Sequence, residues 1–196
     1  MSLNMLAQLG LRVTSGNVFF FDMDGTLVNT DVANFEAYAE AVRRVLGVDI
    51  GGGGEGGRFT RESLKVVIPG LSDREFREIV RVKDEIFPMF LPLTRANSLV
   101  LQVLEGCSKT NVVVLVTKCC EGRAAAILRF YNVFDVFDYK FYKPDVVEMF
   151  FDKYKNALGV LGVRPEDVVV FEDDVCEADA AVAAGIPRGN IVNFAC

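Results

Sequence analysis

Two aspartates two positions apart are the residues of this chain best suited to chemistry. Asp22 and Asp24 directly follow the apolar run Val18–Phe21 and stand just before Gly25 and Thr26. On an extended chain, side chains two positions apart point to the same face. A turn at the glycine would bring backbone N–H groups to the same point. Two carboxylates beside amide donors suit a divalent cation that is bridged to a phosphate group.

Polar side chains also follow two later apolar runs, and a lysine lies between them. These residues are Thr117, Lys143, Glu172, Asp173 and Asp174. Open parallel sheets place their ligand sites at the carboxyl ends of the strands, so we expect these groups to gather around Asp22. Clustered carboxylates repel one another by about 4 kcal/mol at 4 Å and an effective dielectric of 20, and therefore need a counter-cation. Mg²⁺ prefers oxygen ligands and accepts a substrate phosphate, so the pattern predicts Mg²⁺ as the cofactor.

The order of these groups resembles the motif order of the haloacid dehalogenase superfamily of phosphotransferases. The stretch 22–28 is similar to the first motif, DxDGT(L/V), and Thr117 to the second. Lys143 with Pro144 resembles the third, and the acids 172–174 with the downstream Ala-Gly pair resemble the fourth. The resemblance covers about 18–28 and 110–194. It is nearest to the branch of phosphoglycolate phosphatases and β-phosphoglucomutases.

The resemblance implies a role for each acid. Asp22 would attack phosphorus and form an aspartyl-phosphate. Asp24 would protonate the leaving oxygen and then take a proton from water. Mg²⁺ would be held by the Asp22 carboxylate, the Asp24 backbone carbonyl and Asp173, with Glu172 or Asp174 as a further ligand. Dehalogenases of the superfamily lack the acid at position 24, so its presence here points to phosphoryl transfer.

The resemblance also implies a phosphate-binding set. Thr117, Lys118 and the backbone around Met23 and Gly25 would hold the phosphoryl oxygens, while Lys143 would offset their charge. Lys118 stands where many relatives carry asparagine, and this difference leaves the substrate open.

Alternating apolar runs and amphipathic stretches predict an α/β fold with a parallel sheet. Strands are expected at 18–21, 111–117, 136–138, 168–171 and 190–194, and helices at 121–131, 145–158 and 176–184. We therefore predict a three-layer Rossmann-like core over residues 1–27 and 96–196. A small all-helical cap domain, 28–95, would be inserted after the first strand.

The inserted segment shows helical spacing at 29–46, 62–67, 72–82 and 83–90. By the resemblance it is a cap that closes over the site, with Arg58 and Arg61 as candidate substrate contacts. The glycine run 51–57 lacks the Gly-Lys-Ser/Thr ending of a nucleotide P-loop, so we expect a mobile loop there.

Composition excludes several classes of function. The 196 residues contain no histidine, which rules out Ser-His-Asp and Cys-His catalysis and imidazole zinc sites. The net charge of −6 argues against nucleic acid or an anionic membrane as a partner. The apolar runs are shorter than the roughly 18 residues that a membrane span needs. Five cysteines without metal-site spacing indicate reduced thiols, so we expect a soluble cytoplasmic protein, monomeric or homodimeric.

We predict a Mg²⁺-dependent phosphatase that hydrolyses a small phosphorylated metabolite, a phosphomonoester. One alternative is a sugar-phosphate mutase, which must return the phosphate to a sugar before water takes it. Another is a non-catalytic binding or regulatory module on the same fold, whose sign would be the loss of Asp22 or Asp24. A response-regulator-like phosphoacceptor would have no long insertion after the first strand, so the pattern disfavours it.

Overall fold

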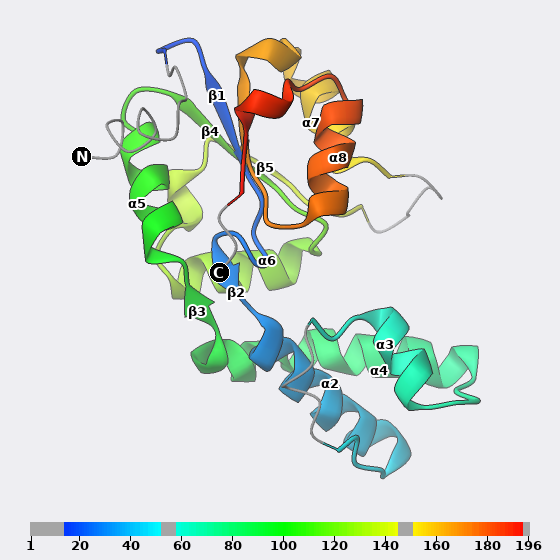
Figure 1. Cartoon of the computed structure of the whole chain (residues 1–196). Coiled ribbons are helices and arrows are strands. Elements are labelled where there is room, and N and C mark those ends of the chain that lie inside the picture. The colour runs from blue at the N-terminus through cyan, green and yellow to red at the C-terminus, as the bar shows by residue number, and fades with distance from the viewer. Residues whose placement is uncertain (1–13, 52–57, 145–150, 194–196) are drawn as a thin grey trace. The chain divides into compact units, whose positions relative to one another are not determined.

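The computed structural model describes residues 14–51, 58–144 and 151–193. The chain divides into two compact units: Thr30–Arg95 forms one, and the chain on either side of it forms the other (Figure 1). Most of the predicted glycine loop and the first part of the helix expected at 145–158 lie outside the described residues.

The larger unit is built on a five-stranded parallel sheet with β1 (Val18–Phe21) in the middle. The strand order is β5-β4-β1-β6-β7. The other bounds are β4 (Val112–Val116), β5 (Tyr139–Phe141), β6 (Val168–Phe171) and β7 (Ile191–Val192). In register, Phe20 lies opposite Val114 on one side and Val170 on the other. The predicted α/β fold with a parallel sheet is confirmed.

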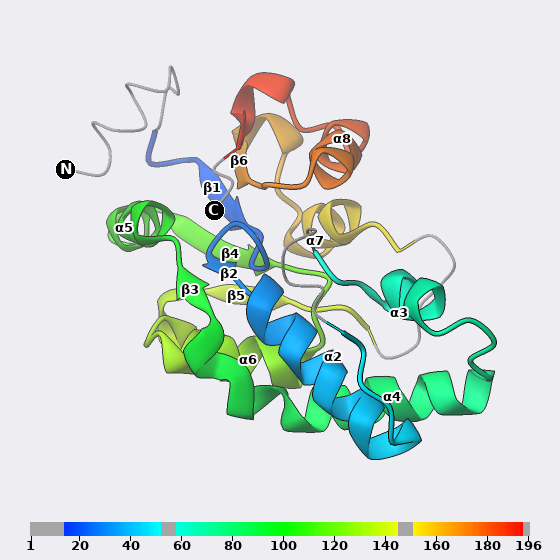
Figure 2. The same ribbon diagram turned by 60° about the horizontal axis from the view of Figure 1, so that its bottom comes forward.

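Alternating side chains of β1 bury both faces of the sheet, which explains why the run is apolar throughout. Val18 and Phe20 share a core with Tyr154, Ala157 and other residues of α7 and α8. On the other face, Phe21 stacks on Phe171 with 4.6 Å between ring centroids. Figures 1 and 2 show α7 and α8 on one side of the sheet and α5 on the other.

Helices and 3-10 turns connect the strands of this unit. The helices are α5 (Ser98–Cys107), α6 (Glu121–Phe130), α7 (Lys153–Leu161) and α8 (Val175–Ala183). The 3-10 turns are η2 (Phe134–Val136), η3 (Pro165–Asp167) and η4 (Arg188–Asn190). None of the helices in the described ranges combines the length and the apolar character needed to cross a membrane.

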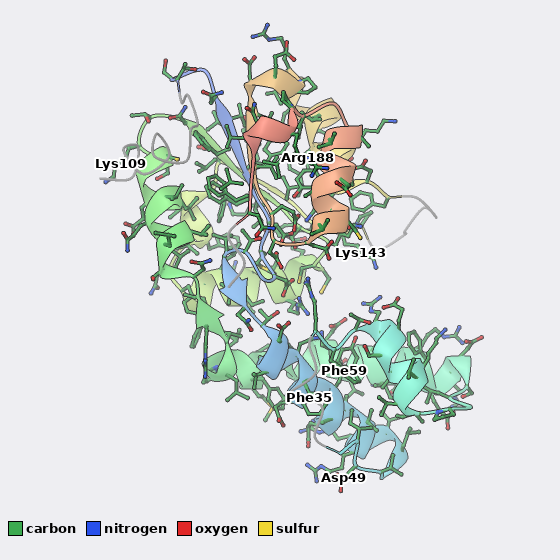
Figure 3. All side chains as sticks on the ribbon, viewed as in Figure 1. Phe35, Asp49, Phe59, Lys109, Lys143 and Arg188 are labelled. Carbon is green, nitrogen blue, oxygen red and sulfur yellow. The ribbon has the colours of Figure 1, made fainter. Side chains whose placement is uncertain are left out.

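The smaller unit is helical and has a core of its own. It contains α2 (Asp31–Leu46), α3 (Arg61–Val67), α4 (Asp73–Ile86) and the 3-10 helix η1 (Phe87–Leu93). The rings of Phe35 and Phe59 meet edge to face in this core, 5.5 Å apart (Figure 3). Two short strands, β2 (Val28–Asn29) and β3 (Arg95–Ala96), pair in a sheet of their own where the chain passes between the units.

Four local predictions of secondary structure were wrong. Of the helix expected at 145–158, the described part begins only at Lys153, where Asp152 caps it, and continues to Leu161. The strand expected at 136–138 lies at Tyr139–Phe141, because the chain first makes the 3-10 turn η2. One helix, α4, replaces the two expected at 72–82 and 83–90, and the chain becomes a 3-10 helix where Pro88 and Pro92 lack an N–H to donate. Helix α5 was not expected, although its buried residues Val100, Val103, Leu104 and Cys107 recur at helical spacing, so the signal was present in the sequence.

Candidate active site

The middle of the sheet places Asp22 between the ends of two neighbouring strands. Its backbone N–H donates to the Phe171 carbonyl at 3.0 Å, which extends the ladder between β1 and β6 by one residue. Asp22 and Asp24 are each 5% exposed. A strand held on both sides therefore carries these acids to the carboxyl edge of the sheet, where open parallel sheets bind ligands.

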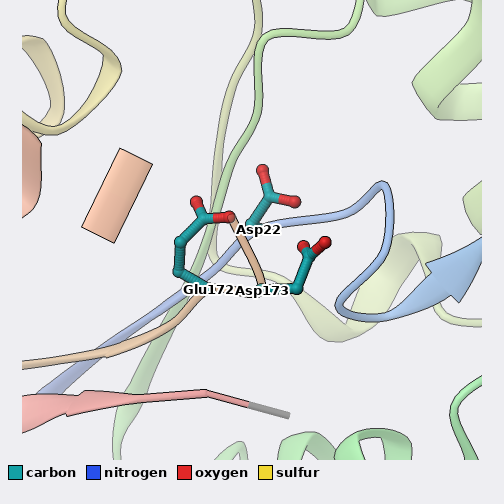
Figure 4. A group of neighbouring side chains, drawn as sticks. All are labelled: Asp22, Glu172 and Asp173. Carbon is teal, nitrogen blue, oxygen red and sulfur yellow. The ribbon is translucent and has the colours of Figure 1, made fainter. Parts of the chain in front are cut away.

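Three acids from the ends of β1 and β6 form a candidate metal site. Carboxylate oxygens of Asp22, Glu172 and Asp173 all lie within 4.8 Å of one another (Figure 4). Thr26 donates its hydroxyl to Asp173 at 2.8 Å and accepts the Asp173 backbone N–H at 3.0 Å, which fixes the third acid. Hard oxygen donors at this spacing fit Mg²⁺.

The remaining predicted acid, Asp174, is used by helix α8. Its carboxylate accepts the backbone N–H groups of Cys176 at 2.8 Å and Glu177 at 3.2 Å, so it is the N-cap of the helix. Among the described residues, the group of acids close enough to share a metal ion does not include Asp174. Of the two acids between which the sequence left the further ligand open, the geometry favours Glu172.

Gly25 lets Asp173 approach the turn after β1. Its φ is +96°, and a Cβ at this position would lie 2.1 Å from Asp173 Oδ2. Both the backbone conformation and the space therefore require glycine. The Gly25 N–H donates to the Val28 carbonyl at 2.9 Å, so the expectation that it faces a phosphate is not met in this structure.

Lys153 forms ion pairs with two of these acids. Its position was not predicted from the sequence. Lys153 Nζ is 2.5 Å from Asp22 Oδ1 and 2.7 Å from Glu172 Oε2, and only 3% of its side chain is exposed. The Tyr154 hydroxyl donates to the same Glu172 oxygen at 2.6 Å. Lys153 is the first residue of α7, whose N-cap is Asp152. An acid followed by apolar residues at helical spacing is the signal that would have located this helix start.

Burial and charge shift the pKa values in this cluster. Burial, joined by the nearby Glu172 carboxylate, raises the pKa of Asp22 to about 7 against the attraction of Lys153. Burial alone would lower the pKa of Lys153, but the carboxylates of Asp22 and Glu172 raise it above its ordinary value. Lys153 therefore stays protonated and positively charged between the carboxylates of Asp22 and Glu172.

The sequence assigned this counter-charge to Lys143. The Lys143 backbone N–H donates to the Cys119 carbonyl at 3.0 Å, and the residue is half-buried just before the segment 145–150 (Figure 3). Its role at the phosphate stays a prediction, and Lys153 is the lysine that the geometry puts on Asp22.

Thr117 and its neighbours follow the end of β4, the strand that pairs with β1 on the side away from β6. The buried Thr117 hydroxyl accepts the backbone N–H of Cys119 at 3.1 Å, which shapes the turn after the strand. Lys118 makes an ion pair with Glu177 of α8. Met23 is buried, and its carbonyl accepts the N–H groups of Leu27 and Val28 at 3.0 Å.

A second missed residue, Arg123 of α6, contacts Asp24. Its Nη2 lies 2.6 Å and 2.5 Å from the two carboxylate oxygens. Burial would lower the pKa of Arg123, but the carboxylate of Asp24, with Cys119 beside it, raises the pKa above its ordinary value. Short-range sequence patterns do not pair residues this far apart in the chain.

The motifs and their geometry agree with a comparison to known families. A model of haloacid dehalogenase-like hydrolases matches residues 17–185. The chain belongs to this family. The predicted family is confirmed, and with it the prediction that the protein is an enzyme.

Individual relatives of this haloacid dehalogenase-like hydrolase include a phosphatase. The chain is 31% identical over 193 residues to a phosphorylated carbohydrates phosphatase of Thermotoga maritima, which covers 86% of this chain and 81% of that protein. A solved structure of a putative beta-phosphoglucomutase, also from Thermotoga maritima, is 27% identical with a TM-score of 0.63, covering 90% and 84% of the two chains. A haloacid dehalogenase-like hydrolase from Bacteroides fragilis has the same fold, with a TM-score of 0.73 at 19% identity over 90% and 86%.

Two predicted substrate contacts of this hydrolase lie in the helical unit. Arg58 is exposed, and Arg61, in the first turn of α3, has a guanidinium nitrogen 3.9 Å from an Asp84 oxygen. Asn34 of α2 donates to the Phe59 carbonyl at 2.7 Å. The assignment of Arg58 and Arg61 to substrate stays a prediction.

Proposed function

We propose that this protein is a Mg²⁺-dependent phosphatase that removes phosphate from a small phosphorylated carbohydrate through an aspartyl-phosphate on Asp22. The observation that carries the proposal is the meeting of Asp22, Glu172 and Asp173 within 4.8 Å, with Lys153 on two of them. The substrate class is supported by the name of the relative that is 31% identical.

The metal would be held by the carboxylates of Asp22 and Asp173, with Glu172 near them and the backbone carbonyl of Asp24 as a further donor. The donor set is made of oxygens alone, which is what Mg²⁺ takes in proteins. When bound, the ion supplies positive charge against the oxygens of the transferring phosphoryl group.

Asp22, Asp24 and Lys153 carry out the remaining steps of the proposed reaction. An Asp22 oxygen forms the new bond to phosphorus while the bond to the leaving oxygen breaks, and Asp24 gives that oxygen its proton. Asp24 then takes a proton from a water molecule, whose oxygen attacks phosphorus and releases phosphate from Asp22. Lys153 holds the Asp22 carboxylate in place and offsets negative charge at the strand ends.

A sugar-phosphate mutase is the second candidate, favoured by the 27% identity to a putative beta-phosphoglucomutase. A mutase would return the phosphoryl group to a sugar hydroxyl instead of to water. A non-catalytic module is less well supported, since Asp22 and Asp24 are both present and buried at the strand end.

The test is phosphate release from p-nitrophenyl phosphate and a panel of phosphorylated carbohydrates, with Mg²⁺ and with EDTA. We expect release that requires Mg²⁺ and falls by more than about a thousandfold in Asp22→Asn. Asp135→Asn is the matched control, because Asp135 is an exposed acid of the same unit. Equal phosphate release by the wild type and Asp22→Asn would contradict the assignment of Asp22 as the nucleophile. Isomerisation of β-glucose 1-phosphate without phosphate release would favour the mutase.

A further inference from the structure

The guanidinium of Arg123 is fixed from two sides. Its Nη2 is shared between both oxygens of Asp24, at 2.6 Å and 2.5 Å. Its Nε lies 2.9 Å from the sulfur of Cys119, which comes just before the helix in the chain. Only 13% of the Arg123 side chain and 7% of the Asp24 side chain are exposed. The pair is thus largely removed from water. A charged hydrogen bond is stronger in such surroundings than in water.

Helix α6 does not need this arginine for its packing. Ala124, Ala125, Ile127 and Leu128 are the buried residues that attach the helix to the core. A buried ion pair is also a weak source of stability, because apolar residues of similar volume often replace it without loss. We therefore look for a role of this ion pair at the candidate active site. One of its members, Asp24, stands two residues after Asp22.

We propose that Arg123 is a positioning residue for Asp24. It keeps the carboxyl group in place while Asp24 gives its proton to the leaving oxygen and later takes one from water. This inference rests on the proposed function, in which Asp24 exchanges those protons. Because Nη2 contacts both oxygens, one contact can lengthen as that oxygen carries the proton while the other keeps the group oriented. A reacting group misplaced by about 1 Å loses about a hundredfold in rate.

The leaving group provides a readout that a merely structural role would not move. p-Nitrophenolate leaves as a stabilised anion and needs little help from an acid, whereas an alkyl alcohol needs its proton. The value of kcat/KM covers the steps up to departure of the leaving group, whereas kcat also covers the later attack of water, which Asp24 assists for every substrate. We expect Arg123→Met to lower kcat/KM for alkyl phosphates at least about tenfold, and kcat/KM for p-nitrophenyl phosphate by less than about threefold. Arg123→Lys, which keeps the charge, should recover part of the loss. Arg129→Met removes an exposed arginine from the same helix and should leave the kinetics with both substrates unchanged.

A double-mutant cycle with Asp24→Asn shows whether Arg123 acts through Asp24. With the acid gone, we expect Arg123→Met to cause no further loss with either substrate. Equal losses of kcat/KM for both substrates, or the same factor of loss in both backgrounds, would overturn the positioning role. Circular dichroism and thermal melting report whether each variant folds, and Arg123→Lys carries the test if the methionine variant does not. A wild type that releases no phosphate overturns the proposed function and this inference with it, whereas an active wild type without the split between substrates overturns this inference alone.

Discussion

Asp22 is a buried carboxyl group, and its burial disfavours the ionised form. In the unfolded chain its pKa is near the ordinary 3.8, and in the folded protein burial raises the pKa to about 7. Between these values the unfolded chain releases the proton and the folded protein retains it. The stability that this group contributes is therefore complete below pH 3.8 and is lost as the pH rises toward 7.

The first prediction at this scale concerns the pH dependence of stability. Asp22→Asn cannot ionise, so its free energy of unfolding without metal should gain on that of the wild type as the pH rises from about 4 to about 8. Urea denaturation at several pH values measures this difference. The readout is its slope with pH, because the loss of the Lys153 contact adds an offset that does not depend on Asp22 titrating. Parallel pH profiles would show that the pKa of Asp22 is not raised.

Lys153 gives the second prediction. Lys153→Met would leave Asp22 and Glu172 buried without their shared cation, and breaking a buried ion pair costs about 3–5 kcal/mol of stability. Lys155→Met is the control, since Lys155 is exposed on the same helix and should change stability by less than about 0.5 kcal/mol. Chemical denaturation of the metal-free proteins measures both. Similar stabilities of the two variants would mean that the acids do not depend on Lys153.

At the scale of elements, the turn after β1 is as important as the strand. Gly25→Ala adds both the strain of a positive φ and a collision with Asp173. Gly162, at the end of α7, also has a positive φ but nothing within 4 Å of an added Cβ, so Gly162→Ala isolates the strain, at about 1–2 kcal/mol. We expect both variants to lose stability and only Gly25→Ala to require more Mg²⁺ for phosphate release. An unchanged Mg²⁺ requirement in Gly25→Ala would separate the turn from the metal site.

Sequence patterns predict the elements that are buried on both faces better than those that are not. The apolar runs of β1, β4 and β6 are distinctive, and each lies within a residue of its predicted range. The strand β5 is short and half-buried, so its pattern does not fix its position along the chain. The motif acids could be found because they follow strong strands directly. Lys153 and Arg123 could not, because their partners are remote in sequence and only the fold brings them together.

For the whole molecule, a metal ion at the strand ends should link binding to folding. A ligand that binds only the folded state stabilises it by about 2.7 kcal/mol when its concentration is 100-fold above Kd. We therefore expect Mg²⁺ to raise the melting temperature of the wild type in a thermal-shift assay. Asp173→Asn removes one acid of the group and should lose most of the shift, while Asp174→Asn should keep it. Equal shifts in both variants would place the ion elsewhere.

The strand order has a consequence for the nascent chain. Residues 18–21 leave the ribosome before both neighbours of this strand, because the inserted unit is translated between them. The inserted unit has its own apolar core and can collapse while translation continues. Until then the three consecutive phenylalanines of β1 have no partner strand, and in this interval the growing polypeptide is most exposed to aggregation.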